Sequence, residues 1–417
     1  MFPRFVMIKQ NYQADKIADI PEAVIKAVRE IEYDLNSLKG QTVGIAVGSR
    51  GISNLGTIVK KVVDLVKEHQ GRPIIFAAMG SHGASTPSGQ EEILHSLGIT
   101  AESIGAEIIW TTESVLYGKA KNGMEVYGAK TALDFDKMII INRIKGHTDF
   151  EDITESGLCK LLAIGIGNHQ GATSIHANAL RLGYGPAIRE AAALMLEKLP
   201  VIFGIAITEN WKQETNGIQG VLPEKLLKTE MALLEKVKNS SIKLPLADLD
   251  TLIIQEAGKN ISGTCVDTKV VGRIMIPGQA EPAAPKIKTV AVLDFTEASH
   301  GNAMGLGVVD IITKRAFAKI DIEATSITGM TSTCLLQAKI PCVAPNDLKA
   351  IEVSFTSTGI EETESLRAIY IKNTSSLEYM AVSEKVFDAI KDKANIEKIS
   401  EPFELTFDEA GNLETLF

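Results

Sequence analysis

The chain has 417 residues, of which 45% are hydrophobic and 23% are charged, a composition typical of a globular protein. Its formal net charge is −9 and its isoelectric point is near 5.5. No long basic block is present, which argues against a nucleic-acid partner.

The first half of the chain alternates short apolar runs with helical patterns. The apolar runs predict strands at residues 42–47, 73–78, 137–142 and 201–207, with helices near 56–69, 86–98 and 223–238. Strands that are apolar on both faces and separated by helices are typical of a largely parallel sheet. We therefore expect an α/β fold.

A polar, proline-containing stretch at residues 239–250 is typical of a linker. Beyond it, a second set of segments predicts strands at 251–258, 289–295, 351–355 and 368–374, with a helix at 306–319. The expected architecture is two α/β domains with largely parallel sheets, residues 1–245 and 246–417.

Cysteine usage and apolar content indicate a cytoplasmic protein. The four cysteines, at positions 159, 265, 334 and 342, form no Cys-x-x-Cys pair, which is typical of reduced thiols. The most apolar run, residues 191–207, is interrupted by Glu197, Lys198 and Pro200, so no membrane span is expected. The first residues lack the apolar stretch of an export signal.

Three polar loops follow strands of the first domain: GSRGISN, MGSHGAST and NRIKGHTDFED. They supply Arg50, His82 and His147, and ligands of open α/β sheets bind beyond the carboxyl ends of strands. Arginine suits a carboxylate or phosphate, and histidine can exchange a proton near neutral pH. A surface arginine and two ordinary loop histidines are the alternatives.

Lys160 and His169 lie nine residues apart, on opposite faces of one straight helix at about 100° per residue. To converge, a helix that begins at Glu155 or Ser156 must stop first, and the GIG sequence around Gly165 suits that stop. His169 is then expected on the loop that follows. Lys160, among leucines, is either a surface lysine with a buried stem or an amine with a chemical use.

Common nucleotide and hydrolase motifs are absent. The glycines at 165, 167 and 171 have the wrong spacing for a dinucleotide site, and no Walker lysine, GxSxG or HExxH sequence occurs.

Six segments together resemble the nickel-pincer nucleotide-dependent lactate racemase family, as a divergent member. They are, in order, VGSRG, MGSHGASTPSGQEEILHSLG, RIKGHTDFEDITESGLCK, GIGNHQGA, EAGKNISGTCVDTK and DFTEASHGNAMGLG, and they extend over most of the chain.

The resemblance implies an active-site cleft between the two domains, with the catalytic and cofactor-binding residues in the first. It also implies a cofactor and a set of roles. The cofactor is the nickel-pincer nucleotide, pyridinium-3,5-dithiocarboxylic acid mononucleotide nickel, tethered at Lys160, with His169 as a metal ligand. His82 and His147 match the acid–base pair. Arg50 matches a contact to the substrate carboxylate, and Lys269, with Lys259 as second choice, matches a substrate lysine.

The function implied is inversion of the hydroxyl-bearing C2 of a small 2-hydroxy acid, lactate or a longer polyol acid or sugar, by reversible hydride transfer. The acidic insert at 149–155 departs from the family. Its carboxylates either bind substrate hydroxyls or form a solvated loop with Glu155 near a helix start. His300 is either a cleft residue or a packed one, and His176 is expected to be structural or exposed.

Two other functions stay open from the residues alone. One is a conventional divalent-metal lyase or hydrolase in which His82, His147 and His169 bind zinc or manganese. The other is a binding protein for small anions or sugars. The expected partners are a small-molecule substrate and neither nucleic acid nor membrane, with assembly as a homodimer left open.

Overall fold

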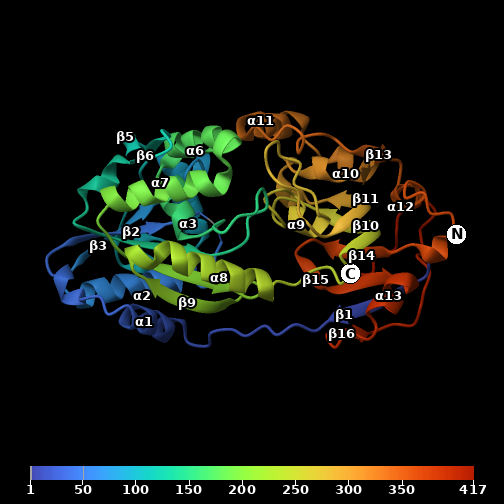
Figure 1. Ribbon diagram of the computed structural model, residues 1–417, viewed down its shortest axis with the longest axis horizontal. Helices are drawn as coiled ribbons and strands as arrows, with labels where there is room; N and C mark the ends of the chain where they lie inside the picture. Colours follow the sequence, from blue (N-terminus) through green and yellow to red (C-terminus); the bar gives the residue numbers. More distant parts are fainter. Residues whose placement is uncertain (1, 50) are drawn as a thin grey trace. The chain divides into compact units, whose positions relative to one another are not determined.

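The computed structural model describes residues 2–49 and 51–417 (Figure 1). The chain divides into two compact units. The amino-terminal unit consists of residues 14–147 and 151–241, and the carboxyl-terminal unit consists of residues 1–13, 148–150 and 242–417. The last change of unit along the chain comes after Ser241.

The amino-terminal unit is built on a six-stranded sheet of order β4-β3-β2-β7-β8-β9, in which only β9 runs antiparallel to its neighbour. A separate hairpin pairs β5 with β6. The strands are β2 (Thr42–Val47), β3 (Arg72–Ala77), β4 (Glu107–Ile109), β5 (Ser114–Lys119), β6 (Glu125–Ala129), β7 (Lys137–Arg143), β8 (Val201–Glu209) and β9 (Thr215–Val221).

Helices cover both faces of this sheet. The helices are α1 (Ile20–Glu30), α2 (Leu55–Glu68), α3 (Pro87–Ser96), α4 (Ala101–Ile104), α5 (Leu158–Lys160), α6 (Asn168–Leu182), α7 (Tyr184–Lys198) and α8 (Leu226–Ser240). Five short turns complete the unit: η1 (Leu35–Leu38), η2 (Gly83–Ser85), η3 (Lys130–Asp134), the π-helical η4 (Leu161–Gly165) and η5 (Pro223–Lys225).

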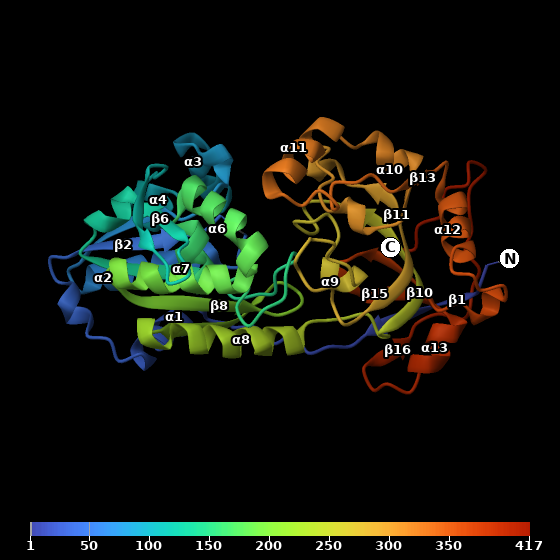
Figure 2. The ribbon, with the colours of Figure 1, turned by 45° about the horizontal axis from the view of Figure 1, so that its top comes forward.

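The two faces have different partners. Alternate strand residues such as Ile45 and Ile139 join the core formed with α1 and α2. The opposite face receives α5, because a Cβ atom on Gly204 of β8 would come within 2.8 Å of Leu158 Cδ1. Helix α8 packs along β8, and α6 lies beside α7 (Figure 2).

The carboxyl-terminal unit has an eight-stranded sheet of order β13-β12-β11-β10-β14-β15-β1-β16. The first five of these strands are parallel and the last three pair antiparallel. The strands are β1 (Phe5–Gln10), β10 (Asp248–Ala257), β11 (Lys286–Phe295), β12 (Ile311–Thr313), β13 (Cys342–Ala344), β14 (Ala368–Asn373), β15 (Ser376–Ser383) and β16 (Ile396–Lys398).

Two buried cores lie on the two faces of this sheet. Leu252 and Ile254 of β10 face one core, and Ile253 faces the other, as the two-residue repeat of a strand requires. The helices are α9 (Thr268–Val271), α10 (Lys314–Ala318), α11 (Ile322–Ser332), α12 (Asp347–Thr356) and α13 (Glu384–Ile390), with turns η6 (Glu297–Ser299), η7 (Leu306–Val308) and η8 (Thr363–Ser365).

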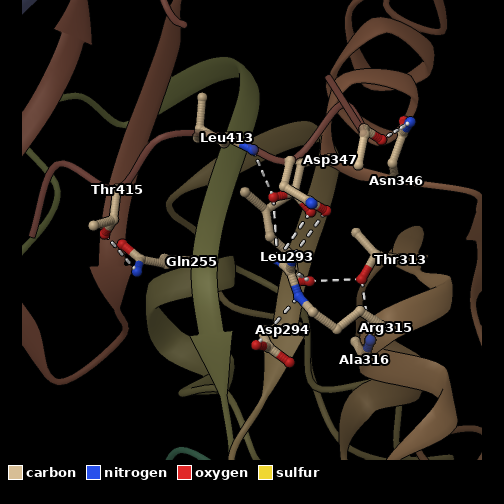
Figure 3. A network of polar contacts seen from close by, with 12 residues as sticks. Gln255, Leu293, Asp294, Thr313, Arg315, Ala316, Asn346, Asp347, Leu413 and Thr415 are labelled. Carbon is tan, nitrogen blue, oxygen red and sulfur yellow. Dashed lines mark hydrogen bonds and ion pairs between the residues drawn. The ribbon is translucent and has the colours of Figure 1, made fainter. Parts of the chain in front are cut away.

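A polar network ties the chain's end to this unit (Figure 3). Buried Asp347, at the start of α12, accepts hydrogen bonds from Arg315 at 3.1 Å and from the Leu413 amide at 2.9 Å. Arg315 also pairs with Asp294 at 3.3 Å. The final residues are therefore part of the folded unit.

The predicted fold class is confirmed: both units are α/β, with sheets that are largely parallel. Two segment predictions were wrong. Residues 351–355 lie in helix α12, and the helix expected at 306–319 contains the short strand β12. The sequence also did not reveal that β1, near the start of the chain, pairs with β15 of the carboxyl-terminal unit.

Within the described ranges 2–49 and 51–417, no helix combines the length and the apolarity that crossing a membrane requires.

Candidate functional site

The loops after β3, β2 and β7 leave the sheet at one edge. These strands are parallel neighbours, with Val47 paired to both Ala77 and Ile141. A hydrogen bond between Ser49 Oγ and His82 Nδ1 joins the first two loops directly. The structure therefore brings two of the three predicted loops into contact. Arg50, the candidate carboxylate contact, lies outside the described residues.

His82 is half-buried and precedes the short turn η2. Its backbone amide donates to the Met79 carbonyl at 3.1 Å, while Ser49 holds one ring nitrogen. A hydrogen bond at Nδ1 fixes how the imidazole ring is oriented. His82 is thus held from both its main chain and its ring.

The loop that carries His147 is fixed by Glu155, which is fully buried. The Glu155 carboxylate accepts a hydrogen bond from the His147 amide and forms an ion pair with Lys238 of α8. Nearby, Asp152 pairs with Arg189 of α7. Glu155 is therefore a buried, paired carboxylate and not part of a solvated loop, and it lies close to the start of α5 as one interpretation of the insert expects.

Lys160 is half-buried and ends the short helix α5. The chain then enters the π-helical turn η4, which ends at Gly165 as the sequence predicts. Gly165 is required there for space, because a Cβ atom would come within 2.7 Å of the Ala78 carbonyl oxygen. The turn therefore packs tightly against the end of β3, and Lys160 lies near the edge where the loops leave the sheet.

His169 is not on a loop as expected, because α6 begins at Asn168, whose φ of 52° redirects the chain. The imidazole is exposed in the first turn of α6. It lines an open cavity of about 620 Å³ between α6 and the β5–β6 hairpin, together with Ser114, Tyr127 and Thr173. Lys160 does not line this cavity.

His176, two turns further along α6, lies close enough to Lys160 for the charge of that lysine to act on it. It is half-buried, and Tyr184 Oη lies 3.3 Å from its Nδ1. Burial, and then the positive charge of Lys160, lower the pKa of His176 to about 4. His176 is therefore a neutral imidazole at neutral pH, and the sequence, which predicts a structural or exposed residue here, does not predict that Lys160 lies near it.

A signal for His176 exists in the sequence. It follows His169 by seven residues, and it is flanked by small and apolar residues typical of a buried helix face. A loop is expected after Gly165, so the sequence prediction does not extend the helical repeat as far as His176.

Across residues 2–49 and 51–417, no group of three or more His, Cys, Asp or Glu side chains is placed to hold a metal ion. The structure thus does not bring His82, His147 and His169 together as a direct metal site.

The remaining candidates lie in the carboxyl-terminal unit. Lys269 is half-buried in α9, and its amide donates to Asp267 Oδ1 at 2.8 Å. Lys259 Nζ donates to the carbonyls of Gly263 and Met304, at 2.7 and 3.0 Å, which favours a structural role. His300 is exposed, with a left-handed φ of 47°.

Comparison with known proteins gives two findings. A family model described as a domain of unknown function, DUF362, matches residues 55–271. The fold is similar to the structure of the lactate racemase apoprotein from Thermoanaerobacterium thermosaccharolyticum, with a TM-score of 0.57 and 11% sequence identity over 89% of this chain and 99% of that chain. No curated protein matches the sequence.

Proposed function

Because the chain belongs to the DUF362 family and has the fold of a lactate racemase, we propose that it is an isomerase that inverts the hydroxyl-bearing C2 of a small 2-hydroxy acid. The observation that carries the proposal is that half-buried, neutral His176 lies close enough to Lys160 for its charge to lower the histidine pKa, beside loops that hold His82 and His147. The fold likeness alone leaves the reaction open.

The donor set suits a nickel-pincer nucleotide. The primary amine of Lys160 is the chemical group that the tether requires, and a neutral imidazole is a common metal donor. The geometry favours His176 over His169 as that donor, since His176 lies near Lys160 and His169 lines an exposed cavity. When bound, such a group supplies an electrophilic carbon that takes hydride from C2 and returns it.

The two loop histidines move the hydroxyl proton. His82, held at Nδ1 by Ser49, exchanges the proton through Nε2, and His147 does so from its own loop. One histidine takes the proton from the substrate hydroxyl as the planar keto acid forms. The centre is inverted when the C2 hydrogen returns to the opposite face of C2, and the other histidine then returns the proton to the oxygen.

The substrate carboxylate is assigned to cationic side chains. Arg50, from the loop between Ser49 and Gly51, and Lys269, on α9, supply the charge that such a group requires. Both residues are those that the sequence prediction names, and the expected substrate class is a small hydroxy acid.

Deuterium distinguishes hydride transfer from deprotonation at C2. Protein purified from cells that make the nickel cofactor is incubated in D₂O with single enantiomers of lactate and of longer 2-hydroxy acids. We expect one substrate to racemise while C2 keeps its original hydrogen. Racemisation with deuterium at C2 would refute hydride transfer, and no racemisation of any acid by nickel-loaded protein would refute the assigned substrate class.

A further inference from the structure

Glu230 of α8 is a buried carboxyl group in contact with the residues just before Lys160. Its side chain is 1% exposed. Its Oε2 accepts a hydrogen bond from the Cys159 amide at 2.9 Å. The residue before α5, Gly157, has no side chain that could provide this contact. The first backbone amides of α5 lack a hydrogen-bond acceptor within their own helix, and Glu230 provides one from α8.

Gly157 is matched to Glu230 by shape. A Cβ atom on Gly157 would come within 2.5 Å of the Glu230 carboxyl carbon, closer than real Cβ contacts allow. Gly157 has an extended φ of 178°, so its backbone conformation does not require glycine. The space taken by the Glu230 carboxyl group is thus the reason for glycine at this position.

Burying this carboxyl group carries a cost. Burial raises the pKa of Glu230 to about 7, and hydrogen bonds from the main chain of Cys159 and Leu158 offset only part of that effect. Its second oxygen, Oε1, has no hydrogen-bond partner among the described residues. An apolar side chain of similar volume would avoid the cost, so packing alone does not explain a carboxyl group here.

We infer that Glu230 is a positioning residue for Lys160: its carboxyl group holds the first turn of α5, and so fixes the direction in which the Lys160 amine leaves the helix. Lys160 is the residue after Cys159, whose backbone amide donates the hydrogen bond to Glu230. A shift of the first turn of α5 therefore moves the Lys160 side-chain amine as well. The inference rests on the proposed role of Lys160 as the attachment point of the cofactor.

The reactivity of the Lys160 amine tests the inference without any cofactor. Purified protein is treated briefly with an amine-acylating reagent, and labelling of Lys160 is measured by peptide mass spectrometry relative to Lys61. Lys61 is a partly buried lysine of the same unit, with 20% of its side chain exposed, so it reports general opening. We expect Glu230→Ala to raise the Lys160 to Lys61 ratio at least fivefold, because the freed turn exposes the amine.

Conservative and matched variants separate positioning from general loss of structure. Glu230→Gln keeps the acceptor and should stay within twofold of the unsubstituted protein. Glu235→Gln removes the same charge from an exposed site on the same helix and should also have no effect. If Glu230→Ala does not fold, Glu230→Met keeps the volume without the acceptor and should show the same fivefold rise.

The close approach of Gly157 to the Glu230 carboxyl group allows an independent test with Gly157→Ala. Gly157→Ala alone should raise the labelling ratio at least fivefold, whereas adding it to Glu230→Ala should change the ratio less than twofold, because the space is then vacant. Equal effects of Gly157→Ala in both backgrounds, or a Glu230→Ala ratio within twofold of the unsubstituted protein, would overturn the inference. Failure to find a cofactor on Lys160 would refute the proposed function and leave these ratios unchanged.

Discussion

At the scale of single residues, Glu230 makes the stability of the chain depend on pH. The raised pKa means that the folded chain keeps the Glu230 proton up to about pH 7, whereas the unfolded chain releases it near the ordinary value of 4.5. The contribution of this protonation to the free energy of unfolding is therefore fully present below about pH 4.5 and is lost as the pH rises through 7.

Replacing Glu230 with glutamine should remove that loss. We expect the free energy of unfolding of Glu230→Gln, relative to the unsubstituted chain, to increase by on the order of 3 kcal/mol between about pH 4.5 and pH 8. Urea titrations at several pH values measure this difference. Glu235→Gln is the control and should show no such trend. A difference for Glu230→Gln that is constant across the range would contradict the assigned burial.

The two histidines of α6 give a second residue-scale prediction. In cells that make the cofactor, His176→Gln should lower nickel retention at least tenfold, because the neutral donor near Lys160 is lost. His169→Gln should retain nickel within threefold, because that side chain lines an exposed cavity. Metal analysis of the two purified variants checks both values. The reverse order would restore His169 as the metal ligand.

At the scale of elements, α8 braces the segment from His147 to Lys160 at two points. Glu230 holds the start of α5, and Lys238, two turns later, pairs with buried Glu155 below the His147 amide. One helix thus supports both a proton-transfer candidate and the attachment candidate.

Replacing Lys238 should leave the buried Glu155 carboxylate without this ion pair. Because Lys238 is 29% exposed, we expect Lys238→Met to lower the free energy of unfolding by about 2 kcal/mol, less than for a fully buried pair. Any turnover should fall with it, since the His147 loop loosens. Chemical denaturation measures the change, with exposed Lys236→Met as the control. Equal stability of the two variants would show that the ion pair does not brace the loop.

The sequence predicts elements well where a pattern is strong and local. The strands at 42–47 and 137–142 are found because they are apolar on both faces and end at polar loops. Residues 351–355 resemble a strand because Ile351, Val353 and Phe355 alternate, yet burial against β10 and β11 makes them helical.

The candidate site is predicted only in part for the same reason. Loop histidines follow strands and are visible in the sequence. The closeness of His176 to Lys160, and the hydrogen bond of the Cys159 amide to Glu230, depend on how α6 and α8 pack, which no short pattern encodes.

At the scale of the whole molecule, two units with separate cores carry the candidate residues. Asp347, which binds Arg315 and the Leu413 amide, belongs to the carboxyl-terminal unit alone (Figure 3).

Asp347→Ala should therefore destabilise one unit selectively. Because Asp347 is buried and Arg315 is 40% exposed, we expect a loss of about 2 kcal/mol confined to the carboxyl-terminal unit. Hydrogen exchange measured by mass spectrometry should show faster exchange in α12 and β14 but unchanged exchange in β2 and β7. Equal acceleration in all four elements would mean that the units unfold as one.

We propose above all that Lys160 is the attachment point of a cofactor. The most direct measurement is the mass of the peptide containing Lys160, from protein purified out of cells that make the nickel-pincer nucleotide, together with its nickel content. We expect a covalent adduct on Lys160 and a nickel content proportional to the amount of adduct. The Lys160→Ala variant should carry neither the adduct nor nickel. An unmodified Lys160 in protein without nickel from the same cells would contradict it.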